Sequence, residues 1–414
     1  MRVSFLSLTD GGMTGMANAR MAELGRHRSV IREIFEYGNR RRAEIGAENV
    51  FDFSLGNPSI PAPAEVTAAL ERLVRETDPV ALHGYTSAPG APAVREKIAA
   101  TIRQRFGVAA DKDDLYLTCG AAASLTIALK ALITPGEQVI CPAPFFPEYR
   151  VFAETAGAEF IIVPCRMGDF QPDVAALERA VTEKTRVLLL NSPNNPTGSV
   201  YTEEILRELA AMLEQKQAAY GHPIYILADE PYRELAYDGE VPFIPALYAN
   251  TLVCYSYSKS FSLPGERIGY IFVPSTAADA RGVYAAVCGA GRALGYVCAP
   301  SLLQYTVGAC AALLPDISVY RQNRDRLYGA LTAWGYTVTP PAGAFYLFVK
   351  APEPDAYAFC ERAKQFELLL VPGDDFGCPG YVRIAYCVAP ETIEGALPRF
   401  KALAETYENR ESAV

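Results

Sequence analysis

The chain has 414 residues, half of them hydrophobic, and a net charge of −9, with charged residues making up 21%. This length and hydrophobic content are sufficient for a large buried core and for two domains. The sequence contains no dense block of lysine and arginine and no run of about 18 apolar residues, which argues against nucleic acid as a main partner and against a membrane span.

The N-terminal part begins with an extension, residues 1–15, whose apolar stretch is too short for a secretory signal. One helix is predicted over residues 17–45, and the segment FDFSLGNPS follows at 51–59. From residue 115 onward, strands and helices alternate. Strands are predicted at 114–120, 137–144, 158–165, 185–193, 223–231, 250–258 and 267–275, and helices at 121–133, 147–157, 173–181 and 202–216.

Such alternation is typical of an α/β domain whose mostly parallel, seven-stranded sheet is sandwiched between helices. The continuous apolar runs VLLL and IYILA fit strands that are covered on both faces. Residues 320–414 again predict helices and strands, and both ends of the chain are expected to build a smaller α+β lobe together. We therefore predict an N-terminal arm with part of the small domain (1–60), a large domain (61–310) and a C-terminal small domain (311–414).

Ligands in open α/β sheets bind beyond the carboxyl ends of the parallel strands, so the residues that follow each strand are the candidates for a site. The first strand is followed by Gly120, Ala121 and Ala122 at the start of a helix, where bare backbone N–H groups suit a phosphate. Small residues there also permit tight packing of strand against helix. Phe145 follows the next strand and either packs in the core or stacks on a flat ligand.

Polar residues follow the later strands. Asn195 lies in a turn after one strand, and Asp229 ends an apolar strand, where a carboxylate is costly unless it meets a cation or strong donors. Tyr232 follows Asp229. The segment after the next strand contains four polar residues, Ser256, Ser258, Lys259 and Arg267.

Together these groups describe one ligand. It has a phosphate, an aromatic ring, a basic ring nitrogen, a phenolic oxygen and a carbon that an amine can attack. Pyridoxal phosphate has all five features, and proteins usually hold it through a Schiff-base lysine and a charged partner at the ring nitrogen.

The motifs that carry a family resemblance are SLGNP (54–58), GYTSAPGAPAVREKIA (84–99), PNNPTG (193–198), DEPY (229–232), SYSKSFSLPGERIGY (256–270) and YVRIAY (381–386). With them the chain resembles the class I/II aminotransferases, which are fold-type I, aspartate-aminotransferase-like enzymes dependent on pyridoxal phosphate. The resemblance spans residues 30–390 and implies that the large domain binds the cofactor.

The resemblance implies catalytic roles for three residues. Lys259 matches the lysine that forms the Schiff base and moves a proton between the substrate Cα and the cofactor C4′. Asp229 matches the carboxylate that keeps the ring nitrogen protonated. Tyr232, with Asn195, matches the pair that contacts the ring 3′-oxygen.

Other matches concern the phosphate and the neighbouring subunit. Arg267, Ser256 and the turn 120–122 resemble the phosphate cup, with alanines where relatives often have a hydroxyl residue or a lysine. Phe145 occupies the position of the stacking aromatic residue, with Phe146 as the alternative one residue on. Tyr85 resembles the tyrosine that reaches the phosphate of the other subunit, which implies a homodimer with shared active sites.

For the substrate, the resemblance implies that Arg383 grips the α-carboxylate in a bidentate fork, with Gly56 and Asn195 beside it. Arg292 either binds a distal carboxylate from the partner subunit or is an ordinary helix arginine. Tyr296, Phe345 and Tyr346 could instead line a pocket for an aromatic or aliphatic side chain, so the donor amino acid stays open.

The expected activity is therefore transfer of an amino group from an L-amino acid to a 2-oxo acid. A carbon–sulfur β-lyase of the same fold is the alternative. A cofactor-binding regulator and a nicotinamide-dependent dehydrogenase fit poorly, because no DNA-binding module precedes residue 30 and no GxGxxG follows a strand. The ten cysteines form no CxxC pair and the three histidines are scattered, which predicts no metal site and a cytoplasmic protein.

Overall fold

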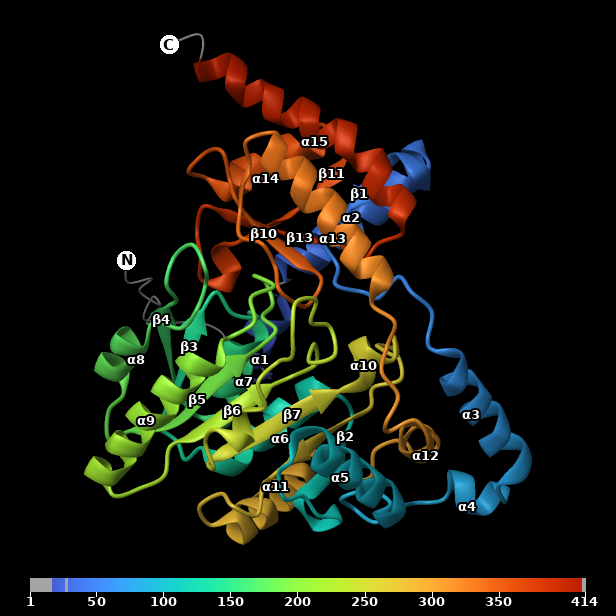
Figure 1. The fold of residues 1–414 in the computed structure, drawn as a ribbon, viewed down its shortest axis with the longest axis vertical. Helices are drawn as coiled ribbons and strands as arrows, with labels where there is room; N and C mark the ends of the chain where they lie inside the picture. The colour runs from blue at the N-terminus through green and yellow to red at the C-terminus, as the bar shows by residue number, and fades with distance from the viewer. Residues whose placement is uncertain (1–16, 27–28, 412–414) are drawn as a thin grey trace.

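A seven-stranded sheet forms the centre of the computed structural model, which describes residues 17–26 and 29–411 (Figure 1). The strand order is β2-β8-β7-β6-β5-β3-β4. The bounds are β2 Leu115–Thr118, β3 Gln138–Ala143, β4 Glu159–Pro164, β5 Thr185–Asn191, β6 Tyr225–Asp229, β7 Thr251–Ser256 and β8 Gly269–Phe272. Only the pairings of β8 with β2 and β7 are antiparallel, so the predicted mostly parallel α/β sheet is confirmed.

Helices cover both faces of this sheet because its central strands are apolar on both faces. In β5, Val187 and Leu189 pack with one group of helices, while Leu188 and Leu190 pack with another. The first group is α6 (Ala121–Leu132), α7 (Glu148–Ala156) and α11 (Ala280–Leu294). The second is α5 (Pro92–Phe106), α8 (Val174–Ala180), α9 (Glu203–Tyr220) and α12 (Ser301–Ala309), with α3 (Ala64–Glu76) and α4 (Pro79–His83) beside α12.

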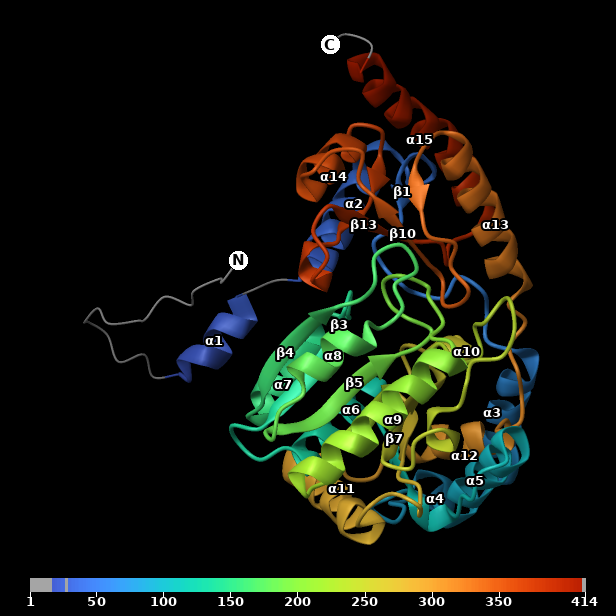
Figure 2. The same ribbon diagram turned by 60° about the vertical axis from the view of Figure 1, so that its left-hand side comes forward.

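Helix α2 (Val30–Ile45) and strand β1 (Phe51–Asp52) lie with the C-terminal part of the chain above this sheet, whereas α1 (Ala19–Arg26) lies apart from them (Figures 1 and 2). Strand β1 pairs in parallel with β11 (Leu368–Leu369). A four-stranded antiparallel sheet has the order β12-β13-β10-β9, with bounds Val371–Pro372, Tyr381–Ala385, Tyr346–Lys350 and Thr337–Val338. Helices α13 (Ser318–Ala333), α14 (Ala356–Lys364) and α15 (Pro390–Glu411) belong to the same part of the chain. The domain boundaries at residues 60 and 310 stay a prediction.

The single helix predicted over residues 17–45 is wrong. The structure has two helices, α1 (Ala19–Arg26) and α2 (Val30–Ile45), and residues 27–28 between them lie outside the described part. Ser29 is extended, with φ −60° and ψ 131°, and its carbonyl accepts the N–H groups of Arg32 and Glu33. The Ser29 side chain makes no capping hydrogen bond. Serine is a weaker helix former than the leucine, alanine and glutamate of the neighbouring helices, and the apolar periodicity does not include this preference. The predicted extension over residues 1–15 also lies outside the described residues.

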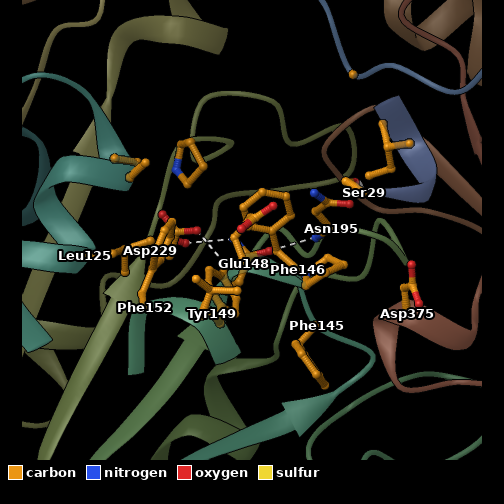
Figure 3. Close-up of a pocket in the computed structure, with 18 of the residues that line it drawn as sticks. Ser29, Leu125, Phe145, Phe146, Glu148, Tyr149, Phe152, Asn195, Asp229 and Asp375 are labelled. Carbon is orange, nitrogen blue, oxygen red and sulfur yellow. Dashed lines mark hydrogen bonds between the residues drawn. The ribbon is translucent and has the colours of Figure 1, made fainter. Parts of the chain in front are cut away.

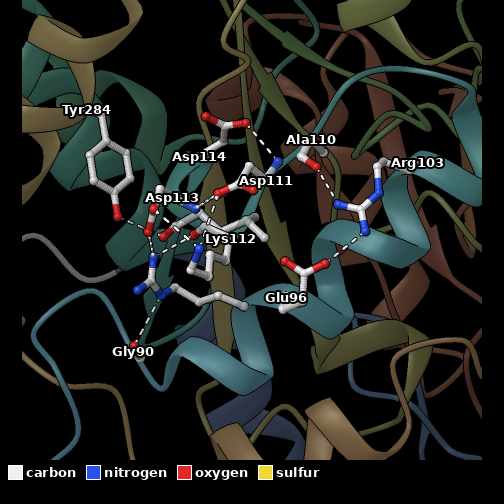
Figure 4. A network of polar contacts seen from close by, with 11 residues as sticks. Gly90, Glu96, Arg103, Ala110, Asp111, Lys112, Asp113, Asp114 and Tyr284 are labelled. Carbon is white, nitrogen blue, oxygen red and sulfur yellow. Dashed lines mark hydrogen bonds and ion pairs between the residues drawn. The ribbon is translucent and has the colours of Figure 1, made fainter.

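A polar network fixes the start of β2 (Figure 4). Asp111 and Asp114 cap the short 3₁₀ helix Lys112–Asp114 reciprocally. Arg95 donates to the carbonyl of Lys112 at 2.5 Å, and Arg103 donates to that of Ala110 at 2.6 Å. The network anchors the strand that leads into α6. Further 3₁₀ turns lie at Ala47–Asn49, Ile244–Ala246 and Asp374–Phe376. None of the helices described in the structure is long and apolar enough to cross a membrane.

Candidate active site

A cavity of about 1140 Å³ opens beyond the carboxyl ends of β5, β6 and β7 (Figure 3). Residues from the ends of these strands line it, and so do residues of β10 and β13 and the first turn of α2. Its walls therefore come from the large sheet, the four-stranded sheet and the N-terminal segment. This is the edge at which ligands bind in open α/β sheets.

Most residues predicted for the site line this cavity. They are Gly56, Ala121, Ala122, Phe145, Asn195, Asp229, Tyr232, Ser256, Ser258, Lys259, Arg267 and Arg383. Gly120 lies directly behind them, because a Cβ on it would be 2.9 Å from a guanidinium nitrogen of Arg267. Phe145 and Phe146, the two candidates for the stacking aromatic residue, both line the cavity.

Two predicted residues lie outside the cavity of their own chain. Tyr85 is 100% exposed, and Arg292 is exposed on α11. Both were predicted to act between subunits, which a single chain does not test. The three residues considered for a side-chain pocket lie apart: Tyr346 lines the cavity, Phe345 lies buried beside Lys259, and Tyr296 is exposed elsewhere.

Lys259 lies in α10 (Tyr257–Ser260), a short helix that starts where β7 ends. Ser256 caps this helix by accepting the N–H of Ser258. The Lys259 ammonium donates to the carbonyl of Gly56 at 2.6 Å. Burial lowers the pKa of Lys259 to about 8; Arg267 and Arg383 lower it too, whereas Cys387 opposes the shift. A less basic amine is more often unprotonated at neutral pH and is therefore a better nucleophile and base.

Asp229 is the last residue of β6. One of its carboxylate oxygens accepts a hydrogen bond, and the other accepts none from the described residues. The phenol of Tyr149 donates to Oδ2, while Oδ1 is buried and has no hydrogen-bond partner among the described residues. Burial raises the pKa of Asp229 to about 7. The hydrogen bond from Tyr149 lowers this pKa, and the charge of Glu230 raises it further. A buried carboxylate oxygen in this state is costly unless a donor or cation reaches it.

Arg383 on β13 is 2% exposed and faces the same cavity. It donates to Asn195 Oδ1 at 3.0 Å and to the carbonyl of Ser54 at 2.5 Å. No carboxylate in the described part of the chain pairs with it, and its buried Nε has no partner there. Burial lowers its pKa. A buried guanidinium is costly without an anion, and its fork of donors suits a carboxylate.

The N-terminus of α6 and Arg267 form another part of the cavity wall. Gly120 precedes the helix with φ 86°, a conformation that favours glycine, and no side chain caps this end. The N–H groups of the first turn therefore remain available to an anion. Arg267, with φ 52°, and the hydroxyls of Ser256 and Ser258 lie beside it. Left-handed backbone at a non-glycine residue often marks a functional position.

Several residues of the site were not predicted. Tyr149 holds Asp229, and Asn191 links two strand ends by accepting the N–H of Asn195 at 2.7 Å and donating to the carbonyl of Asp229 at 2.9 Å. Ser29 and Ile31 of the N-terminal segment also line the cavity. Tyr149 lies four residues after Phe145, close enough for the same segment to supply both, which is the one signal the sequence contained.

These features fit pyridoxal phosphate. The helix N-terminus with Arg267 suits the phosphate, and the unpaired Oδ1 of Asp229 suits a protonated ring nitrogen. The amine of Lys259 suits the aldehyde carbon, and the two candidates for the stacking aromatic residue, Phe145 and Phe146, both line the cavity. None of these cofactor groups requires Arg383, which can therefore bind a second anion, such as the carboxylate of a substrate.

Comparisons with known proteins agree with this geometry. The model of the family described as aminotransferase class I and II matches residues 48–400. The aspartate/prephenate aminotransferase of Thermus thermophilus is 31% identical over 351 residues, covering 83% of this chain and 88% of that protein. The crystal structure of an aminotransferase from Eubacterium rectale is 53% identical, with a TM-score of 0.93 over 96% of this chain and 100% of the other. The structure of Thermus thermophilus aspartate aminotransferase with maleate is 26% identical, with a TM-score of 0.82 over 94% and 100%.

Proposed function

The chain belongs to the aminotransferase class I and II family, and from that premise we propose that it moves the amino group of an L-α-amino acid to a 2-oxo acid with pyridoxal phosphate attached at Lys259. One observation carries the proposal: a lysine, a carboxylate and two arginines, Lys259, Asp229, Arg267 and Arg383, line a single cavity in which each has a separate task. Transamination is favoured over elimination because the related proteins described above are named aminotransferases.

When bound, the cofactor supplies an aldehyde that links to amines and a pyridine ring that takes up electrons as the substrate loses a proton. The chain supplies the rest. Asp229 holds the proton on the ring nitrogen, because its buried Oδ1 is otherwise unpaired. Tyr232 and Asn195 orient the ring 3′-oxygen. Arg267 and the first turn of α6 hold the phosphate.

Lys259 is the proton-transfer group. With a pKa of about 8, its amine can accept the proton from the substrate Cα and release it again near neutral pH. The carbonyl of Gly56, 2.6 Å away, directs the amine into the cavity. The buried phenols of Tyr232 and Tyr346 lie nearby, and burial raises both of their pKa values, so they remain protonated during this step.

Arg383 selects substrates that carry an α-carboxylate, because its guanidinium is buried and pairs with no carboxylate among the described residues. We expect Arg383→Ala to raise the KM for the donor amino acid by about 100-fold or more, since charge-assisted bidentate hydrogen bonds are lost. The Kd for pyridoxal phosphate should change by less than about threefold, because the phosphate is assigned to Arg267 and the first turn of α6 and not to Arg383.

Steady-state kinetics and a cofactor titration measure the two effects. The matched control is the decarboxylated amine of the same donor, for which wild type and variant should react at equally slow rates. A variant that loses cofactor affinity while its KM for the amino acid is unchanged would show that the carboxylate binds elsewhere.

We also propose a homodimer in which Tyr85 and Arg292 reach the neighbouring active site. The segment of Tyr85 lies beside the end of α11, because the thiol of Cys298 contacts the carbonyl of Thr86 at 3.2 Å. Exposed apolar side chains gather along these two segments, namely Val80, Tyr85, Leu294, Tyr296 and Val297. Grouped exposure of this kind is typical of an interface. Sedimentation of the protein as a monomer would contradict the proposal.

A further inference from the structure

Tyr346, at the start of β10, contacts three groups of the site at once. Its hydroxyl lies 2.9 Å from that of Tyr232. The guanidinium carbon of Arg383 is 4.7 Å from the centre of its ring. Gly56 passes so close that a Cβ there would be 2.1 Å from the Tyr346 hydroxyl. One side chain therefore touches the proposed substrate grip, the lysine-facing loop and the residue assigned to the cofactor oxygen.

Burial and nearby charges act on both phenols of the Tyr232–Tyr346 hydrogen bond. Burial raises the pKa of Tyr346 to about 12, and the nearby Arg383 cation opposes that rise. Burial raises the pKa of Tyr232 well above its ordinary value, and the hydrogen bond to Tyr346 and the charge of Asp229 add to this. The charged and titratable groups around the pair are thus Arg383, Asp229 and Cys387. The distance of 2.9 Å between the two oxygens allows either hydroxyl to donate.

A phenol has one proton to donate. If Tyr346 donates to Tyr232, the proton of Tyr232 is free to point into the cavity. No other hydrogen bond of the Tyr346 hydroxyl is found among the described side chains and backbone groups. Tyr232 can therefore donate its proton into the cavity only when Tyr346 donates the hydrogen bond between the two phenols.

We propose that Tyr346 is a positioning residue. Its hydroxyl turns the Tyr232 proton toward the cofactor oxygen, and its ring holds the guanidinium of Arg383 in place by a cation–π contact. The inference rests on the proposed function, because Tyr232 and Arg383 have these tasks only in a cofactor-dependent aminotransferase. It assigns separate tasks to the two parts of one side chain. Removing the hydroxyl alone should disturb the cofactor oxygen and leave the carboxylate grip intact.

Tyr346→Phe in the holoenzyme tests this separation. A hydrogen bond donated to the cofactor oxygen favours its deprotonated form, so a weaker bond should raise the pH midpoint of the visible band by roughly 0.5 to 1 pH unit. The Kd of a 2-methyl amino acid, which binds but has no Cα proton to lose, should stay within about threefold, because the ring under Arg383 remains. Spectral titration gives both numbers without any turnover.

A double-mutant cycle with Tyr232→Phe shows whether Tyr346 acts through Tyr232. In that background Tyr346→Phe should cause no further shift. The matched control is Tyr336→Phe, which removes another buried phenol hydroxyl, bonded to the carbonyl of Phe400 at 3.0 Å away from the cavity. It should leave the midpoint unchanged even if it lowers the melting temperature.

An unshifted midpoint in Tyr346→Phe, or a shift that adds in full to that of Tyr232→Phe, would overturn this inference alone. A wild-type protein that shows no visible band with added pyridoxal phosphate would overturn the proposed function and this inference with it. The two failures are therefore distinguishable from the same set of spectra.

Discussion

Replacing Lys259 with alanine should reduce turnover by roughly 10⁴-fold or more, because one amine serves as the attachment point of the cofactor and as the proton-transfer group. No other lysine of the described chain lines the cavity. The nearby side chains of Arg267 and Arg383 have hydrogen-bond donors and no acceptor, so they cannot replace it as a base. Rate measurement under saturating donor and acceptor gives the effect.

The fold should survive this change. Lys259 makes one hydrogen bond, to the carbonyl of Gly56, and its burial is unfavourable to the charged amine. The melting temperature of the cofactor-free variant should therefore be close to that of the cofactor-free wild type. Lys130→Ala, an exposed lysine on α6, is the matched control and should keep full activity. Turnover retained in a folded Lys259→Ala protein would refute the mechanism.

Asp229→Asn should lower the rate by roughly 10²- to 10⁴-fold, because the amide has nearly the same shape but cannot hold a proton on the ring nitrogen. Asp238→Asn, at an exposed carboxylate paired with Arg324, is the control and should have no such effect. Near wild-type turnover in Asp229→Asn would mean that the ring nitrogen has another partner.

A second measurement on the same variant needs no cofactor. Asp229 has a pKa of about 7 in the folded protein against 3.8 for a free side chain, so the folded state binds more protons between these values. The stability that Asp229 contributes is therefore present at low pH and is lost as the pH rises toward 7. The free energy of unfolding of the cofactor-free protein should fall over this range, and Asp229→Asn should flatten the fall. An unchanged pH profile would contradict the buried, partly unpaired state of this carboxylate.

The sequence was sufficient to predict the sheet and the residues at its carboxyl edge, because both depend on short-range patterns. Apolar runs such as the one ending at Asp229 identify a strand. The first polar residue after the run then lies at the edge of the sheet formed by the carboxyl ends of its strands. Lys259 and Arg267 come from one continuous segment, so their proximity also followed from the sequence.

Contacts between distant segments could not be predicted in the same way. Tyr149 and Asp229 are 80 residues apart, and Tyr232 and Tyr346 are 114 apart. In the sequence alone, each of these tyrosines cannot be distinguished from a tyrosine that only packs in the core. The break before α2 was missed for a different reason: the apolar periodicity is helical on both sides of Ser29, and Ser29 makes no side-chain capping hydrogen bond that would mark a helix start.

The central claim is that the protein transfers amino groups through a cofactor at Lys259, and a visible absorbance spectrum tests it most directly. The purified protein is supplied with pyridoxal phosphate, titrated with amino acids, and then treated with a 2-oxo acid. We expect a visible band that disappears with donor amino acids and returns with the 2-oxo acid, and the effective donors would identify the substrate class. A band that persists while ammonia and a 2-oxo acid are released would indicate elimination instead, and the absence of any band would contradict the proposed site.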